Sequence, residues 1–172
     1  MTERPFNTDE PIGYFITWTT YGTWLPGDER GWHRWGEGNV QPPNELFAEM
    51  ALSEMKETAL TLSPHERDIV EQTIVRHCEI RSWTLHAVNA RSNHVHIVVT
   101  ARGYHPKTVR DQFKAWCTRH LKPGNRGRKR FWTEGGSCRW INYEDDLESA
   151  IVYVNDAQDR KVNDVQARRA SE

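Results

Sequence analysis

The pattern of hydrophobic and polar positions along the chain predicts strands, helices and one long loop. Runs rich in aromatic and β-branched residues, or with apolar residues at every second position, predict strands at Tyr14–Tyr21, Trp83–Ala90 and Val95–Ala101, with a short strand or hairpin over Phe131–Trp132 and Cys138–Ile141. Apolar residues three to four positions apart predict helices at Glu45–Leu60, from Ser63 through Cys78, at Pro106–Leu121 and from Glu144 onward. The Gly-, Pro- and Trp-rich stretch after the first strand predicts the loop.

The order of these segments predicts the fold class. Strand, helices, hairpin, helix, strand and helix in succession favour an α+β fold, in which a mainly antiparallel sheet has helices packed on one face. At 172 residues the chain is expected to form a single domain, residues 1–172, that is large enough to bury a core.

Two histidines share one face of a predicted strand in the stretch NARSNHVHIVVT, residues 89–100. Strand side chains two residues apart point the same way, so His94 and His96 lie together, opposite a core face of Val95, Ile97 and Val99. Two imidazoles at this spacing can converge on one cation or one phosphate oxygen. The competing interpretation is a pair of histidines satisfied by their neighbours. Two imidazoles supply half of a tetrahedral zinc site and leave positions open, which suits catalysis better than structure.

The charge of the chain is unevenly distributed. The net charge is −1, yet residues 102–130 hold ten lysines and arginines against one acid, Asp111. A basic block on a nearly neutral protein favours a polyanionic partner, although a solvated helix face followed by a basic loop would have the same composition. The side chains expected to contact DNA are Arg110, Lys114, Arg119, Lys122, Arg126, Arg128, Lys129 and Arg130, and Arg110 and Lys114 are expected to be free for phosphates.

Cysteine spacing and hydropathy narrow the class of protein. Cys78, Cys117 and Cys138 are far apart and form no Cys-x-x-Cys pair, so they are expected to be buried small side chains rather than disulfides or zinc ligands. No apolar run approaches the about 20 residues that span a bilayer, and the first residues resemble no signal peptide. We therefore expect no membrane partner and a cytoplasmic location.

Aromatic and histidine side chains in the predicted loop and helices have two interpretations each. Trp24, Trp32 and Trp35 in the long loop could stack on nucleic-acid bases, but clamping the loop onto the core is favoured. His77 falls on the apolar stripe of its helix and is expected to be a packed core residue rather than a ligand.

The last predicted helix has a tyrosine at the edge of its apolar stripe. Leu147, Ala150, Ile151 and Val154 form the stripe, and Tyr153 lies about 100° from its centre on an ideal helix. At that boundary an aromatic ring can pack while its hydroxyl protrudes. The structural alternative is an aromatic side chain that merely covers the edge of the core.

Several of these features together resemble a known family. SNHVHIVVT, a following helix, and then RFWTEGGSCRWINYEDDLESAIVYVNDAQDR resemble the HUH single-tyrosine transposases, including the insertion-sequence type and the REP-associated tyrosine transposases. The resemblance covers residues 13–160 and implies a ferredoxin-like, HUH-type arrangement of the sheet and helices. Residues 24–60 would be a longer loop-helix region than in the shortest members, and residues 161–172 a flexible tail.

The resemblance implies roles for individual residues. His94 and His96 match the two metal-binding histidines of the family, and Tyr153 matches its nucleophile. The family's third ligand, often Gln, stands one helical turn after the tyrosine, where this chain has Ala157. Asp156 and Gln158 are the alternatives, about 60° and 140° from Tyr153 on an ideal α-helix.

The implied activity is metal-dependent cleavage and rejoining of single-stranded hairpin DNA through a 5′-phosphotyrosine intermediate. Its cofactor would be Mg²⁺ or Mn²⁺, and its active form a homodimer. Two other functions fit the same residues: a domesticated protein that binds hairpin DNA without cutting it, and a metal-dependent nuclease that uses activated water.

Overall fold

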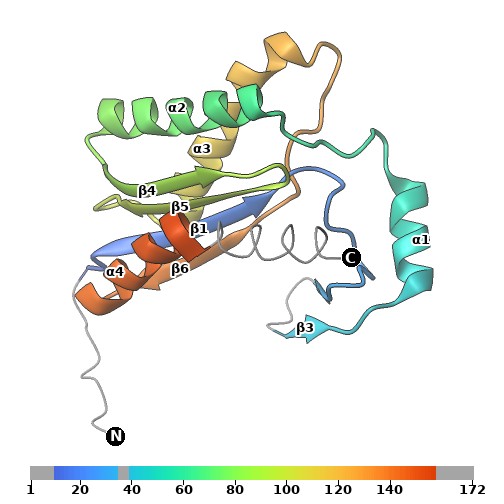
Figure 1. Ribbon diagram of the computed structural model, residues 1–172, viewed down its shortest axis with the longest axis horizontal. Helices are drawn as coiled ribbons and strands as arrows, with labels where there is room; N and C mark the ends of the chain where they lie inside the picture. The colour runs from blue at the N-terminus through green and yellow to red at the C-terminus, as the bar shows by residue number, and fades with distance from the viewer. Residues whose placement is uncertain (1–9, 35–38, 158–172) are drawn as a thin grey trace, which may run out of the picture.

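A four-stranded antiparallel sheet forms the centre of the computed structural model, which describes residues 10–34 and 39–157. Figure 1 shows the sheet with helices on either side. The strands lie in the order β4-β5-β1-β6, and each neighbouring pair is antiparallel. Their bounds are Gly13–Thr19 for β1, Thr84–Ala90 for β4, His94–Thr100 for β5 and Ser137–Ile141 for β6. The α+β fold class expected from the sequence is confirmed.

Two helices cover one face of the sheet and enclose the larger core. They are α2 (Pro64–Arg81) and α3 (Pro106–Leu121), and α3 runs into a short 3₁₀ turn, η1 (Lys122–Gly124). Helix α2 begins at a capping box, in which Ser63 and Glu66 satisfy each other's backbone N–H groups. The fully buried side chains of this core include Ile16, Trp18, Val70, Ile74, Val95, Ile97, Val99, Val109 and Phe113.

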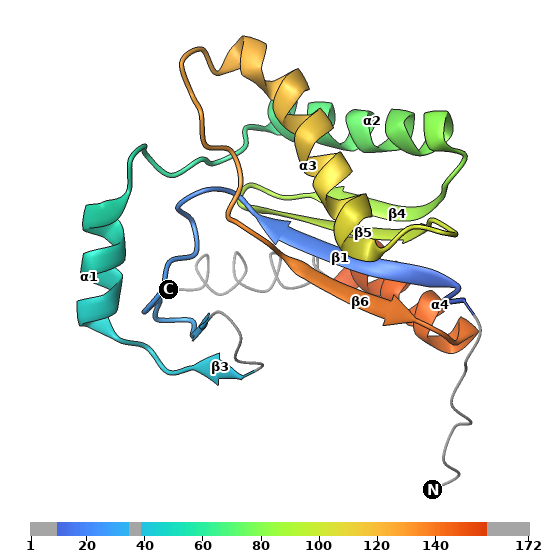
Figure 2. The ribbon, with the colours of Figure 1, turned by 180° about the vertical axis from the view of Figure 1, so that it is seen from behind.

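The opposite face of the sheet is also covered, which corrects the expectation of helices on one face. Helix α4 (Glu144–Val152) lies there and continues as a π turn, η2 (Tyr153–Ala157). Figure 2 shows α3 in front of the sheet and α4 behind it. A second, smaller core fills this interface. The polar-looking face of the strands also presents the apolar side chains of Phe15, Ala87, Val98 and Ile141, and Leu147 of α4 and Val154 of η2 pack against them.

An arm between β1 and α2 stands to one side of the sheet (Figures 1 and 2). It contains β2 (Trp32–His33), β3 (Val40–Gln41) and α1 (Glu45–Glu54). The predicted helix over Glu45–Leu60 is too long, since α1 ends at Glu54. Beyond it the backbone is held by tertiary contacts instead: the Glu57 carboxylate accepts hydrogen bonds from the backbone of Lys129 and Arg130, and Leu60 N–H donates to the Tyr21 carbonyl.

Candidate metal and nucleophile site

The two histidines of β5 lie side by side on the α4 face of the sheet. Their ring centroids are 4.6 Å apart. Thr17 faces His96 across the β1–β5 ladder, and its Oγ1 lies 2.7 Å from His96 Nδ1. The Asn93 Oδ1 atom lies 2.6 Å from His94 Nδ1. Both rings are therefore oriented through Nδ1, the arrangement in which Nε2 is the nitrogen presented to a metal.

His96 is held in its neutral form. The side chain is only 8% exposed, and burial lowers its pKa to about 4, with the positive charges of His94 and Arg91 acting in the same direction. A neutral imidazole is the form that coordinates a metal ion. At neutral pH His96 needs no deprotonation before it can act as a ligand.

Tyr153 lies beside this pair within the same chain. Its ring centroid is 5.9 Å from that of His96 and 5.9 Å from that of Phe15, edge-on to both. The side chain is 39% exposed, so its ring packs while part of it reaches solvent. The next residue, Val154, is fully buried in the smaller core and holds this segment against the sheet.

The backbone that carries Tyr153 is not an ordinary α-helix. Tyr153–Ala157 forms a π turn, in which hydrogen bonds join residues five apart. Angles expected for an ideal α-helix therefore do not apply beyond Tyr153. Such turns are rare and often occur at functional sites.

No third His, Cys, Asp or Glu side chain joins the histidines in the described part of the chain. Within residues 10–34 and 39–157, no group of three or more His, Cys, Asp or Glu side chains is arranged to hold a metal ion. Asp156 is exposed on the π turn and does not complete such a group. Gln158 lies outside the described residues.

The other four tyrosines have structural surroundings. The Tyr14 hydroxyl donates to the Tyr104 carbonyl at 2.7 Å, and burial raises the pKa of Tyr14. The Tyr21 hydroxyl accepts a hydrogen bond from the Lys56 backbone. Tyr104 packs against Trp83, and Tyr143 occupies the N-cap position of α4.

Two residues of the basic block are used by the protein itself. Arg110 is 8% exposed, and its guanidinium donates to Asp111 and to the Gly136 carbonyl. The Lys114 ammonium donates to the carbonyls of Thr133 and Gly135, at 2.8 and 2.9 Å, and burial lowers its pKa. The expectation that Arg110 and Lys114 are free for phosphates is wrong, because both hold the segment that leads into β6.

Arg128 is also committed to an internal contact. Its guanidinium donates to the Thr58 carbonyl at 3.0 Å and lies 3.8 Å from the Glu57 carboxylate. Together with the backbone bonds to Glu57, this fastens the basic loop, residues 125–130 after η1, to the segment after α1. The remaining basic residues of the block that were expected to contact DNA have exposed side chains: Arg119, Lys122, Arg126, Lys129 and Arg130.

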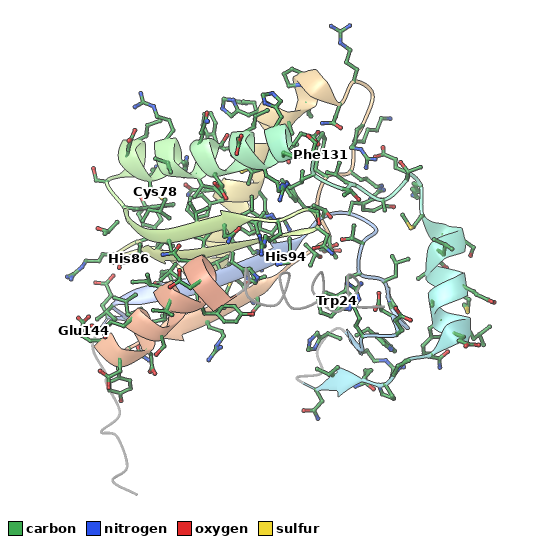
Figure 3. The ribbon with its side chains drawn as sticks, in the orientation of Figure 1. Trp24, Cys78, His86, His94, Phe131 and Glu144 are labelled. Carbon is green, nitrogen blue, oxygen red and sulfur yellow. The ribbon has the colours of Figure 1, made fainter. Side chains whose placement is uncertain are left out.

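The basic loop joins the sheet at the end where the histidines begin. Thr20 N–H donates to the Asn93 carbonyl, and Tyr21 N–H donates to the Phe131 carbonyl. Figure 3 shows His94 and Phe131 at the same end of the sheet, with His86 and Glu144 toward the other. The segment that follows the loop and the start of β5 thus lie at the same end of the sheet.

The cysteines and His77, which the sequence predicts to be packed side chains rather than ligands, mostly lie as expected. Cys78 and Cys117 are buried and Cys138 is half-buried, all as free thiols. His77 is 4% exposed and bonded to Gln112 at 2.9 Å, as expected of a core histidine.

The tryptophans of the arm take part in its internal packing. Trp32 is buried against Phe47, and the Trp24 indole donates to the Gly31 carbonyl. Trp35 lies outside the described residues.

Sequence reasoning missed three residues that shape the site. Thr17 orients His96, Asn89 donates to the Val154 carbonyl at 3.0 Å, and the charge of Arg91 acts on His96. Thr17 could have been found by pairing the first strand with the histidine strand. It lies two residues from Phe15 and so shares one face of β1 with it. The contact of Asn89 depends on the path of α4 and leaves no signal in the sequence.

Comparisons with known proteins agree with the fold. No family model and no curated protein sequence matches the chain. A solved structure of a REP-associated tyrosine transposase bound to a REP hairpin is similar, with 12% sequence identity and a TM-score of 0.52 over 90% of this chain and 70% of that one. At that identity the similarity shows the fold, which is consistent with that of the HUH transposases. In the described part of the chain, no helix is long and apolar enough to span a membrane.

Proposed function

We propose that the protein cleaves and rejoins single-stranded hairpin DNA through a covalent tyrosine intermediate, with Tyr153 as the nucleophile and His94 and His96 as metal ligands. The observation that carries this proposal is the position of the Tyr153 ring, 5.9 Å from the ring of a buried, neutral histidine. A partly exposed phenol beside two oriented imidazoles is a suitable arrangement for phosphoryl transfer.

The chemistry explains why these residue types are needed. The Tyr153 oxygen would form a bond to phosphorus as the bond from phosphorus to the 3′ oxygen breaks. The phenol loses its proton, and the released 3′ oxygen gains one. One phosphodiester is exchanged for another, so rejoining needs no ATP.

The two histidines fit a divalent metal ion as neutral nitrogen donors that are each oriented through Nδ1. Mg²⁺ or Mn²⁺ bound there would make the phosphate more electrophilic and offset the charge that develops on its oxygens. For the further ligand we propose the same two candidates as the sequence, Asp156 on the π turn and Gln158, which follows the described residues.

The DNA surface we propose is smaller than the basic block. Its cations are the exposed residues Arg119, Lys122, Arg126, Lys129 and Arg130, of which the last three belong to the loop beside the histidine end of the sheet. Phosphate contacts of this kind position the strand without reading its sequence. The similar transposase binds a REP hairpin, and we propose a hairpin ligand for this chain as well.

Tyr153 and both histidines meet within one chain, so the homodimer that the family resemblance implies is not needed to assemble these three residues.

A labelled hairpin with single-stranded flanks tests the proposal. Incubation with Mg²⁺ or Mn²⁺ should give a protein–DNA adduct that survives a denaturing gel and carries label only from the 3′ side of the cut. Cleavage without an adduct would identify a nuclease that uses water. Tight binding without cleavage would identify a hairpin-binding protein.

A further inference from the structure

The side chain of Asn89 joins the sheet to the segment that carries Tyr153. Its Nδ2 atom donates to the backbone carbonyl of Val154, with a nitrogen–oxygen distance of 3.0 Å across 65 positions of sequence. Asn89 belongs to β4, and Val154 is the second residue of the π turn. The hydrogen bond therefore ties an edge strand directly to the backbone next to the proposed nucleophile.

Asn89 is also the neighbour of a proposed metal ligand. It is the register partner of His96 in the antiparallel β4–β5 ladder, so both side chains emerge on the α4 face of the sheet. One residue thus lies beside a proposed ligand and, through its amide, holds the backbone of the Tyr153 segment.

Apolar packing alone cannot fix the position of this segment. Val154 is fully buried with Val98 and Ala87, but the hydrophobic effect is non-directional and permits small rotations and shifts. A hydrogen bond to a carbonyl is directional. In a π turn, where the regular i→i+4 pattern is interrupted, such an external donor fixes a backbone that the helix itself holds less firmly.

We infer that Asn89 is a positioning residue that fixes the Tyr153 segment over the histidine pair and so sets the distance between the phenol oxygen and the phosphate. This inference rests on the proposed function. In-line attack is sensitive to geometry, and a misplacement of about 1 Å can reduce a rate about 100-fold. Asn89 would act on the rate of adduct formation and not on the binding of hairpin or metal.

Two substitutions at position 89 test the inference in the full-length protein. Asn89→Leu keeps the approximate size of the side chain and removes the donor, and Asn89→Ala removes both. At saturating hairpin, the rate of adduct formation should fall about 10- to 100-fold. The hairpin dissociation constant and the Mn²⁺ concentration that gives half-maximal rate should stay within about twofold of wild type.

Gln112→Leu is a matched control. It also removes a side-chain amide that bonds between two elements, because Gln112 Oε1 lies 2.9 Å from His77 Nε2 on the other face of the sheet. It should alter thermal stability to an extent similar to that of the Asn89 variants, and leave the adduct rate unchanged. An equal fall in the adduct rate of all three variants would overturn the inference, since the effect would then be general destabilisation.

Hydrogen exchange without DNA separates the inference from the proposed function. Peptides that cover Tyr153–Ala157 should exchange faster in both Asn89 variants than in wild type or Gln112→Leu. Unchanged exchange, or an adduct rate within twofold of wild type in both Asn89 variants, overturns the role of Asn89. Absence of an adduct in wild type overturns the proposed function, and exchange then decides whether Asn89 holds the segment.

Discussion

Thr17 and His96 face each other across the β1–β5 ladder, with the threonine hydroxyl oxygen 2.7 Å from imidazole Nδ1. This contact fixes the ring orientation from a neighbouring strand, and burial keeps the ring neutral. Partners of this kind raise the metal affinity of a histidine by orienting it before the ion arrives. Thr17 is therefore expected to matter for metal binding although it would not touch the ion.

Thr17→Val should weaken metal binding by about 10-fold, within the range seen for such supporting contacts. The substitution keeps the shape of the side chain and removes the hydroxyl. Titration of Mn²⁺ by calorimetry measures the effect. Thr73→Val is the control, because Thr73 lies in α2 on the other side of the sheet and its hydroxyl donates to the Ile69 carbonyl. Equal loss of affinity in both variants would show that the Thr17 contact has no special role.

Acid should destabilise the protein through His96. Its pKa is lowered from 6.5 to about 4, so the unfolded state takes up its proton first as the pH falls. The stability due to neutral His96 is present above pH 6.5 and is lost as the pH falls toward 4, by up to about 3 kcal/mol. Chemical unfolding in EDTA measures this loss, which should be smaller in His96→Asn. An identical pH profile in the variant would contradict the buried neutral histidine.

His94→Ala should abolish metal-dependent cleavage with little change in the thermal transition, since His94 is only half-buried at the end of its strand. His96→Ala should also cost stability, because its ring packs against Phe15 and the change leaves a cavity. If His94→Ala unfolds while metal does not affect the melting of wild type, the pair is structural.

The basic loop should divide into contacts with DNA and contacts within the protein. Replacing Arg126, Lys129 and Arg130 by Gln should flatten the salt dependence of single-stranded DNA binding by about 0.7 per lost contact. Arg128→Gln should instead lower the melting temperature, because Arg128 fastens the loop to Thr58 and Glu57. A full salt slope in the triple variant would show that the loop is merely solvated.

Local patterns in the sequence predict most of the fold. The limits of α3 follow from its apolar spacing, and the core face of β5 from strict alternation at Val95, Ile97 and Val99. The second core escaped prediction because its members, such as Phe15 and Val98, alternate with the polar residues Thr17 and His96 on one face. Such a mixed face is typical of a solvated strand as well as of a site under a helix.

Tertiary contacts explain the remaining differences. The segment after α1 has helical composition, but α1 ends at Glu54, and the Glu57 side chain accepts hydrogen bonds from the backbone of Lys129 and Arg130. Arg110 and Lys114 look like surface cations on a helical wheel, yet nearby carbonyls accept their hydrogen bonds. The π turn at Tyr153 likewise has no sequence signature. A one-dimensional pattern does not record which partner a polar side chain will meet.

The most direct test of the account removes one oxygen atom. Tyr153→Phe keeps the ring that packs against Phe15 and His96 and deletes the proposed nucleophile, while Tyr143→Phe makes the same change ten residues earlier, at the N-cap of α4. Both variants and wild type are incubated with hairpins labelled on either side of the cut in Mg²⁺ or Mn²⁺, then run on denaturing gels. We expect normal folding and hairpin binding in both variants, with the covalent adduct present in Tyr143→Phe and absent from Tyr153→Phe. An adduct that persists in Tyr153→Phe and disappears in Tyr143→Phe would contradict this expectation and move the nucleophile to Tyr143.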